Sequence, residues 1–318
     1  MSRLEAVFLG TGGSMPTTGR NHPSIVIKYQ GWNLMFDAGE DVQRQFERAK
    51  LGTNKRMAIY ITHRHPDHLL GLGGLLLRFS LLGRTKPLSV YGPSELIEYV
   101  RMAQDSINLG TTFDTTVYAV EPGTVSEIEN VRVTAFEVDH RGHALGYKVV
   151  YQKPTGPFLP ERAIELDIPK GSIWRKLAAG ESVVLDNGRA VNPEDVTGPQ
   201  PPPLSVVYSG DTRPCDALLE ASKEADLLIC EAMYTSDNAD LAEERGHMTA
   251  KAAAEIARDC KVKLLALTHY SPRYGDGTAI IDEARKVFPD VMLARDLMRI
   301  TLSSDGTHSI EMPDAQTT

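Results

Sequence analysis

Short apolar runs, each closed by a glycine, a proline or a polar cluster, recur along most of this chain. Such runs predict buried strands, whereas longer stretches with apolar residues every three or four positions predict helices. Strands are predicted at residues 6–12, 24–28, 33–36, 57–61, 88–93, 117–120, 131–138, 145–151, 205–208, 226–231 and 263–267. Helices are predicted at residues 69–82, 94–106, 247–260 and 280–288, and one more after Asp37. Strands and helices that alternate in this way predict a layered α/β fold.

One stretch, residues 153–203, departs from this pattern because it is rich in proline and glycine. Within it we expect a short helix at residues 173–177 and a hairpin at residues 182–190 that turns at Asp186-Asn187-Gly188. We therefore predict a single domain over residues 1–318 with an inserted arm at about residues 153–203.

The densest group of metal-binding side chains follows the predicted strand at residues 57–61. His63, His65, Asp67 and His68 fall within one short turn. Imidazole and carboxylate groups suit a divalent cation such as zinc, and a rigid strand can aim several of them at one point. A polar surface turn is the alternative interpretation, but this spacing directly after a strand favours a metal site.

Three later residues stand at the carboxyl ends of predicted strands, where functional groups of layered α/β folds collect. They are His140, Asp211 and His269. Taken singly, each histidine is more simply a structural residue, and Asp211 is more simply a turn former. Together with the turn at His63 they predict one joint metal centre.

The segment Thr62-His63-Arg64-His65-Pro66-Asp67-His68 resembles the signature of the metallo-β-lactamase fold superfamily. The resemblance implies a four-layer αββα sandwich, in which two sheets are flanked by helices. It also implies two divalent metal ions. The ligands would be His63, His65 and His140 for one ion and Asp67, His68 and His269 for the other, with Asp211 bridging.

Two cations about 3.5 to 4 Å apart orient a bridging water as hydroxide and stabilise charge on the attacked centre, which is hydrolytic chemistry. Zinc is the expected metal, although manganese and iron accept the same ligands. The role of Asp67 stays open between a ligand, a general base and both.

A narrower resemblance, to the ribonuclease Z family of transfer-RNA 3′-processing endonucleases, extends over nearly the whole chain. The segments that carry it are Phe8-Leu9-Gly10-Thr11-Gly12, Arg20-Asn21, Phe36-Asp37-Ala38-Gly39-Glu40 with Gln43 and Gln45, Ser80-Leu81-Leu82-Gly83-Arg84-Thr85, Tyr208-Ser209-Gly210-Asp211-Thr212-Arg213 and Leu267-Thr268-His269-Tyr270-Ser271-Pro272-Arg273-Tyr274. The arm is similar to that family's substrate-gripping exosite. The resemblance implies a homodimer that removes the 3′ trailer of precursor transfer RNA through a metal-bridging hydroxide.

Further residues are candidates for the chemistry of such a cleavage. His247, expected at a helix start and partnered by Glu231, is suited to protonate the leaving 3′ oxygen. A helix-capping residue is the alternative for His247. Arg20 and Arg273 are candidates to bind substrate phosphate, with a solvated surface charge as the alternative for each.

Several loops differ from the usual ribonuclease Z motifs. Thr18 stands where the family has a lysine, and Met233 and Met248 replace residues of its His-Glu-Ala-Thr and His-Ser-Thr loops. These differences favour an alternative function, a related metallo-hydrolase that acts on small phosphodiesters, esters or lactones. A non-enzymatic binding protein is a third hypothesis, against which the full set of metal ligands speaks.

Charge also bears on the choice of substrate. The chain of 318 residues has a net charge of −8, with 42% hydrophobic and 24% charged residues, so it lacks the basic character of most RNA-binding proteins. The arm has six basic and seven acidic residues, and only Lys170, Arg175 and Lys176, near Trp174, form a modest basic group. A dimer-stabilising or active-site-covering loop is the alternative interpretation of the arm.

Cellular context follows from what the sequence lacks. It shows neither a signal peptide nor an apolar run long enough to span a membrane, so we expect a cytoplasmic protein with no membrane partner. Cys215, Cys230 and Cys260 are widely spaced and form no Cys-x-x-Cys motif. We expect small buried hydrophobic residues rather than disulfides or thiolate ligands at these positions.

Overall fold

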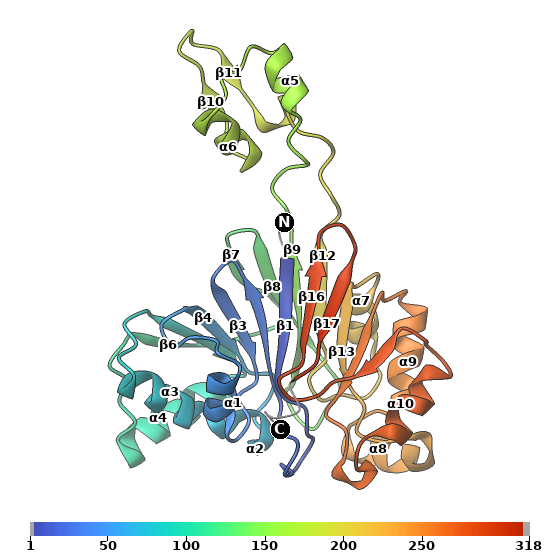
Figure 1. Ribbon diagram of the computed structural model, residues 1–318. Helices are drawn as coiled ribbons and strands as arrows, with labels where there is room; N and C mark the ends of the chain where they lie inside the picture. Colours follow the sequence, from blue (N-terminus) through green and yellow to red (C-terminus); the bar gives the residue numbers. More distant parts are fainter. Residues whose placement is uncertain (1–2, 314–318) are drawn as a thin grey trace.

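Two β-sheets packed face to face, with helices on both outer faces, form the body of the protein (Figure 1). The computed structural model describes residues 3–313. The four layers confirm the predicted αββα sandwich. An arm extends from one end of this body, far beyond the edges of the sheets.

The first sheet has eight strands in the order β17-β16-β1-β2-β3-β4-β5-β6. Their bounds are β1 Arg3–Gly10, β2 Ser24–Tyr29, β3 Trp32–Phe36, β4 Arg56–Tyr60, β5 Leu88–Gly92, β6 Thr115–Ala119, β16 Arg299–Ser303 and β17 His308–Glu311. Strands β3 to β6 are parallel neighbours, so their carboxyl ends lie at one edge of the sheet.

The second sheet has seven strands in the order β15-β14-β13-β12-β9-β8-β7. Their bounds are β7 Gly123–Ile128, β8 Val131–Glu137, β9 Leu145–Tyr151, β12 Leu204–Tyr208, β13 Leu227–Glu231, β14 Leu265–Thr268 and β15 Val291–Leu293. Strands β12 to β15 are parallel, whereas β9 runs antiparallel to β12.

Helices cover the outer face of each sheet. Those against the first sheet are α1 Val42–Arg48, α2 Pro66–Leu69, α3 Gly71–Leu81 and α4 Glu95–Ile107. Those on the side of the second sheet are α7 Asp216–Ser222, α8 Ala239–Arg245, α9 Ala250–Asp259 and α10 Thr278–Arg285, with short 3-10 turns η2 Ser236–Asn238 and η3 Pro272–Tyr274. None of the helices in residues 3–313 has the length and apolar character needed to cross a membrane.

The alternation of side chains along each strand explains the layers. In β1, Leu4, Ala6 and Phe8 point into the core between the two sheets, whereas Val7 and Leu9 point toward the helices. Strand β12 does the same in the second sheet. Because successive side chains leave a strand on opposite faces, a strand that is apolar throughout is buried on both.

The arm is a small folded unit with its own apolar cluster. It contains α5 Pro160–Glu165, α6 Ser172–Ala178, the hairpin of β10 Val183–Val184 and β11 Ala190–Val191, and η1 Pro193–Asp195. Its buried side chains are Ala163, Ile168, Leu177, Leu185, Val191 and Val196. The expected short helix and hairpin are therefore both present.

Several sequence predictions need correction. The single helix expected at residues 69–82 is two helices, α2 and α3, and the helix expected from residue 247 begins only at Ala250. Asp37 does not open a helix, because α1 begins at Val42. All three cysteines are free, as expected, although Cys215 is only partly buried.

Candidate metal centre

The metal-binding turn follows β4 at the edge where the parallel strands end. Strand β3 ends next to Asp37, β12 leads to Asp211 and β14 leads to His269, while His140 follows β8. The residues predicted from separate strand ends therefore meet at one end of the sandwich, beside α2 at the bottom of Figure 1.

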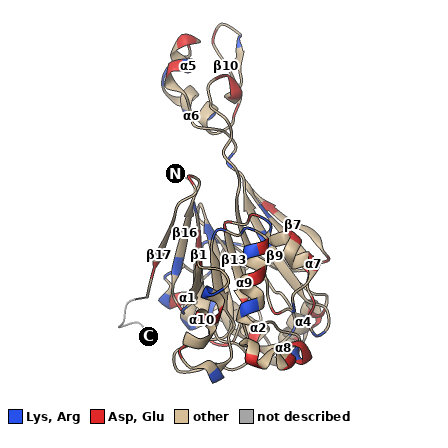
Figure 2. Cartoon of the chain, turned by 90° about the vertical axis from the view of Figure 1, so that its right-hand side faces the viewer, with Lys and Arg blue, Asp and Glu red and all other residues tan. Residues whose placement is uncertain are grey.

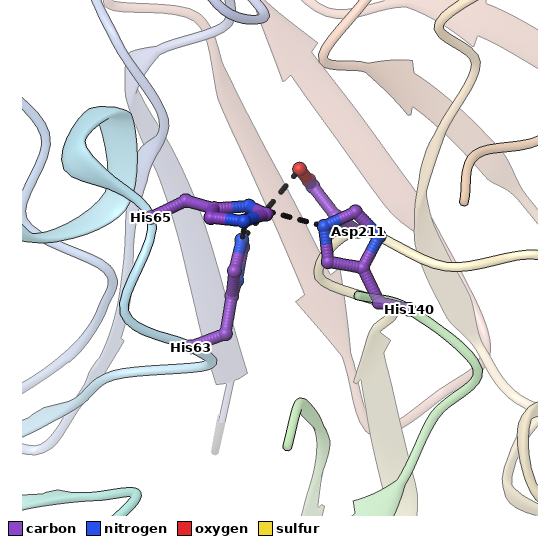
Figure 3. Close-up of side chains that lie close together, drawn as sticks. All are labelled: His63, His65, His140 and Asp211. Carbon is purple, nitrogen blue, oxygen red and sulfur yellow. Dashed lines mark hydrogen bonds and ion pairs between the residues drawn. The ribbon is translucent and has the colours of Figure 1, made fainter. Parts of the chain in front are cut away.

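Three imidazoles and one carboxylate form the first cluster. His63 and His65 come from the turn, and the rings of His63, His65 and His140 point toward one another, with Asp211 beside them (Figure 3). Nδ1 of His65 lies 2.9 Å from Nε2 of His63 and 3.1 Å from Nε2 of His140. Oδ2 of Asp211 lies 3.8 Å from Nε2 of His63.

A second cluster, formed by Asp67, His68 and His269, lies next to the first. Oδ1 of Asp211 lies 3.3 Å from Nε2 of His68 and 3.3 Å from Nε2 of His269. One oxygen of Asp211 therefore faces each of these clusters. Asp211, His247 and His269 form a third group of the same kind.

Neighbouring groups fix the orientation of the imidazole rings. Nδ1 of His68 donates to Oδ2 of Asp37 at 2.7 Å, and Nδ1 of His140 donates to the Gly246 carbonyl at 2.6 Å. The Thr62 hydroxyl donates to Asp37, and Nδ1 of His63 donates to that hydroxyl at 2.9 Å. With their protons held on Nδ1, His63 and His140 present unprotonated Nε2 atoms to the centre, which is the arrangement of histidine metal ligands.

The electrostatics of the site also fit a bound cation. Burial lowers the pKa of His63, His65 and His140, so these imidazoles are neutral and their nitrogen lone pairs crowd together. Burial also lowers the pKa of His68, but Asp211, Asp37 and Asp67 outweigh it and hold that pKa well above its usual value. The same negative charges attract a divalent cation, which compensates both the lone pairs and the carboxylates.

Close packing brings two loops up to these clusters. Gly13 lies against His269, where a Cβ atom would come within 2.7 Å of the His269 carbonyl oxygen. A Cβ atom on Gly39 would lie 2.5 Å from the Asp67 carbonyl oxygen, and Gly39 has no positive φ. Glycine is therefore required at position 39 for close approach and not for a left-handed turn.

His247 and Glu231 form a hydrogen-bonded pair beside the clusters. Nδ1 of His247 donates to Oε1 of the fully buried Glu231 at 2.9 Å. Burial lowers the pKa of His247, but the carboxylate outweighs it and raises that pKa to about 9. Nδ1 of His247 also lies 4.0 Å from Oδ2 of Asp211, so the ring borders the metal centre.

The expected helix start at His247 is wrong. Helix α8 ends at Arg245, and Thr249 caps α9 by accepting a hydrogen bond from the Ala252 amide. His247 lies in the connection between the two helices. The alternative role as a helix cap is therefore taken by Thr249, and His247 is free to face the centre.

A cavity of about 580 Å³ opens over these clusters. Its lining includes candidate ligands and His247, together with Arg141, Arg245, Glu244 and His22, which the sequence did not identify. Arg141 directly follows His140, and Arg245 precedes His247 by two residues, which is the only signal that the sequence offers. His22 is 7% exposed.

Neither arginine predicted to bind phosphate lines this cavity. The guanidinium group of Arg20 is buried over the Tyr270 ring, 3.6 Å from its centroid, and donates to the Tyr270 carbonyl at 2.8 Å. Arg20 is therefore not a solvated surface charge. Arg273 is exposed and donates to Oδ1 of Asn238 at 3.1 Å.

The arm leaves the body at the end opposite to this centre. The amide of Leu145, at the start of β9, donates to the Thr62 carbonyl beside the metal turn, whereas the arm begins beyond Tyr151 at the other end of β9. Figure 1 shows the arm and α2 at opposite ends. The arm therefore does not cover the metal centre of its own chain.

Asp37 provides a first prediction about this centre. It is fully buried and accepts hydrogen bonds from His68, Thr62 and the Tyr208 hydroxyl. We expect Asp37→Asn to lower metal affinity about 10- to 100-fold, because His68 loses the acceptor that orients it. We also expect unfolding free energy to fall by about 1–3 kcal/mol, because buried donors lose an ionised partner.

Metal titration and urea unfolding measure the two effects. Asp105→Asn, an exposed change on α4, serves as the control and should alter neither. Metal affinity of Asp37→Asn equal to that of the native protein would contradict the role of Asp37.

Comparison with known proteins relates the whole chain to one family. It is 40% identical over 298 residues to ribonuclease Z of Methanosarcina mazei, with 93% of this chain and 97% of that protein covered. It is 41% identical to ribonuclease Z of Gemmatimonas aurantiaca, with 93% and 95% covered. The family model of the anti-Pycsar protein Apyc1 matches residues 4–153, and that of the beta-lactamase superfamily domain matches residues 200–270.

Solved structures agree with these matches. The short form of human tRNase Z superposes with a TM-score of 0.67 at 26% identity, covering 93% of this chain and 98% of that chain. The metallo-beta-lactamase fold protein YhfI from Bacillus subtilis gives a TM-score of 0.67 at 19% identity, covering 94% and 99%, which supports the fold alone.

Proposed function

This chain belongs to the ribonuclease Z family, and from that premise we propose that it is a metal-dependent endoribonuclease that removes the 3′ trailer of precursor transfer RNA. The observation that carries the proposal is the roughly 40% identity to ribonuclease Z proteins over nearly the full length of both chains. The two clusters that share Asp211 supply a site suited to the reaction.

We propose that His63, His65 and His140 hold one divalent ion and that Asp67, His68 and His269 hold the other, with Asp211 between them. Two such ions, with zinc as the expected metal, would activate water and stabilise the charge that develops on the attacked phosphate. Asp67 accepts a hydrogen bond from the Ser14 amide at 3.1 Å, which fixes its carboxylate at the rim of the cavity. From there it is placed to bind metal or to accept a proton.

His247 is proposed as the group that protonates the leaving 3′ oxygen. Its position over the centre and its hydrogen bond to Glu231 support this role, because the carboxylate orients the ring and keeps it charged. Glu231 is itself fixed by the Thr212 amide, which donates to Oε1 at 2.7 Å. Glu231 is therefore a positioning residue for His247.

For substrate phosphate, we favour Arg141 and Arg245 over Arg20 and Arg273. Both line the cavity, and guanidinium groups pair well with phosphate oxygens. Arg20 is engaged by Tyr270, so its proposed role is to hold the loop at residues 17–20 against the strand end near His269.

The arm is proposed to hold the body of the transfer RNA. It lies at the end away from its own metal centre, so the RNA it holds either extends along the sandwich or enters the centre of a second copy. The second arrangement accords with the expected homodimer. Homodimer formation, zinc as the metal and a cytoplasmic location all remain predictions from the sequence.

A substrate comparison tests the proposed function. Purified protein loaded with zinc is incubated with a precursor transfer RNA that has a 3′ trailer and, separately, with bis-(p-nitrophenyl) phosphate. We expect cleavage that releases the trailer and leaves a 3′ hydroxyl on the transfer RNA. Turnover of the small ester with the RNA left intact would instead support the alternative hydrolase.

A further inference from the structure

A second large cavity lies far from the metal centre, at the base of the arm. It has a volume of about 810 Å³ and is formed by the start of β1, the turn between β2 and β3, the loop between α1 and β4, the first residue of the arm, and Ser304 after β16. Strands β3 and β4 begin beside this cavity and end beside the metal turn, so the two sites lie at opposite ends of the sheet.

The lining of this cavity is strongly basic. Its cationic residues are Arg3, Lys28, Lys50, Lys55 and Lys153, and the acidic residue among its lining is Glu5. Glu5 is already neutralised by Lys28 at 2.7 Å and by Arg299 at 2.5 Å. Within residues 3–313, the other four lining cations have no acidic partner within ion-pair distance. This local excess of positive charge occurs in a chain with a net charge of −8.

The aromatic side chains at this end of the sheet do not belong to the charged face. Tyr29 is only 1% exposed and packs with Trp32 in the core between the two sheets. Lys28, the residue before Tyr29, leaves the strand on the opposite face and pairs with Glu5. The four cations without an acidic partner therefore define this cavity as a site for an anion.

We propose that this basic cavity binds phosphate groups of the RNA substrate's backbone, which rests on the function proposed above. The cavity and the arm share one end of the sandwich, and Lys153 belongs to both, so an RNA held by the arm would lie across the cavity. The arm itself has six basic and seven acidic residues, and both colours occur on it in Figure 2. The cavity supplies the clustered positive charge that the arm lacks and that release of RNA counterions requires.

Two lysines on the loop between α1 and β4 allow a clean test. We choose Lys50→Gln together with Lys55→Gln, because glutamine keeps an unbranched polar side chain without the charge, and Lys50 has a φ of 54° that the control must match. The control is Lys261→Gln with Lys286→Gln, which removes the same charge outside the cavity. Lys261 has a φ of 55°, so it matches Lys50 in backbone conformation. Binding of fluorescein-labelled precursor transfer RNA is measured by anisotropy over a series of KCl concentrations.

We expect the cavity variant to bind the RNA about tenfold more weakly and to show a salt slope lower by about two, one for each lysine that contacts a phosphate. Turnover of bis-(p-nitrophenyl) phosphate should stay unchanged, because the metal centre lies at the other end of the sheet. The control should bind RNA like the native protein. Native-like affinity and salt slope in the cavity variant, or equal weakening in the control, would overturn the inference.

Failure of this inference is distinguishable from failure of the proposed function. If the native protein cleaves the RNA and the cavity variant binds it normally, only the basic cavity is refuted. If the native protein binds the RNA without cleaving it, the proposed function fails and the anisotropy comparison still decides the cavity. If the native protein does not bind the RNA at all, both fail. ATP as a competitor distinguishes RNA backbone phosphate from a free nucleotide as the ligand of the cavity. Displacement of the RNA by micromolar ATP would show a preference for free nucleotides and would overturn the inference.

Discussion

Replacement of His65 by alanine is expected to lower kcat/KM on precursor transfer RNA by about a thousandfold or more. His65 contacts both His63 and His140, so its loss opens the first metal cluster. Bound metal contributes several kcal/mol of transition-state stabilisation, and each 1.36 kcal/mol corresponds to a factor of ten in rate. Elemental analysis of the purified variant should show reduced metal content alongside the loss of activity.

His65 is suited to this test because it is only partly buried, so its truncation should leave the fold intact. His308→Ala, an exposed change in β17, is the matched control and should keep both metal and activity. Unchanged metal content and activity in His65→Ala would remove both the endonuclease and the alternative hydrolase as functions of this site.

The fold was predictable because its central strands are apolar on both faces. The segments 57–61 and 226–231 belong to different sheets, and each lies between the other sheet and a layer of helices. Burial on both faces produces a continuous apolar run within each segment. Strands β15 and β16 were not predicted, and neither were β7 and β17, in which no side chain is buried. Strands β7 and β17 exist through pairing with β8 and β16, an interaction between strands that a local pattern does not record.

The positions of the candidate metal ligands were predictable for a related reason. Each follows a strand that the apolar pattern identifies, and parallel strands place their carboxyl ends at one edge, so His140, Asp211 and His269 come together without long loops. The resemblance to the metallo-β-lactamase fold superfamily added the expected grouping of these residues around two ions.

The arginines were harder to predict because their environments depend on long-range contacts. Arg20 is buried by Tyr270, which lies 250 positions away in the sequence. Arg141 and Arg245 meet at the cavity only because the loops after β8 and α8 adjoin, as the hydrogen bond from Arg141 to the Glu244 carbonyl shows. The basic cavity at the arm base likewise gathers residues from five separate segments.

Replacement of His247 by alanine is expected to lower kcat on precursor transfer RNA by about 10²- to 10⁴-fold, the usual contribution of a general acid. Its ring borders the metal centre and forms a third possible ligand group with Asp211 and His269. As a proton donor outside the two proposed ion sites, His247 should leave metal content near the native value when it is replaced. Loss of metal together with activity would indicate instead that His247 is a ligand. The measurement is informative because Nδ1 of His247 lies 4.0 Å from Oδ2 of Asp211.

The leaving group separates proton donation by His247 from a structural role. The 3′ oxygen of RNA is a poor leaving group that needs a proton, whereas p-nitrophenolate departs readily without one. Turnover of bis-(p-nitrophenyl) phosphate by His247→Ala should therefore fall far less than cleavage of RNA. Glu231→Gln should show the same selectivity in weaker form, because glutamine still accepts a hydrogen bond from the ring but no longer stabilises its charge. An equal loss on both substrates would mean that His247 holds the site together and donates no proton.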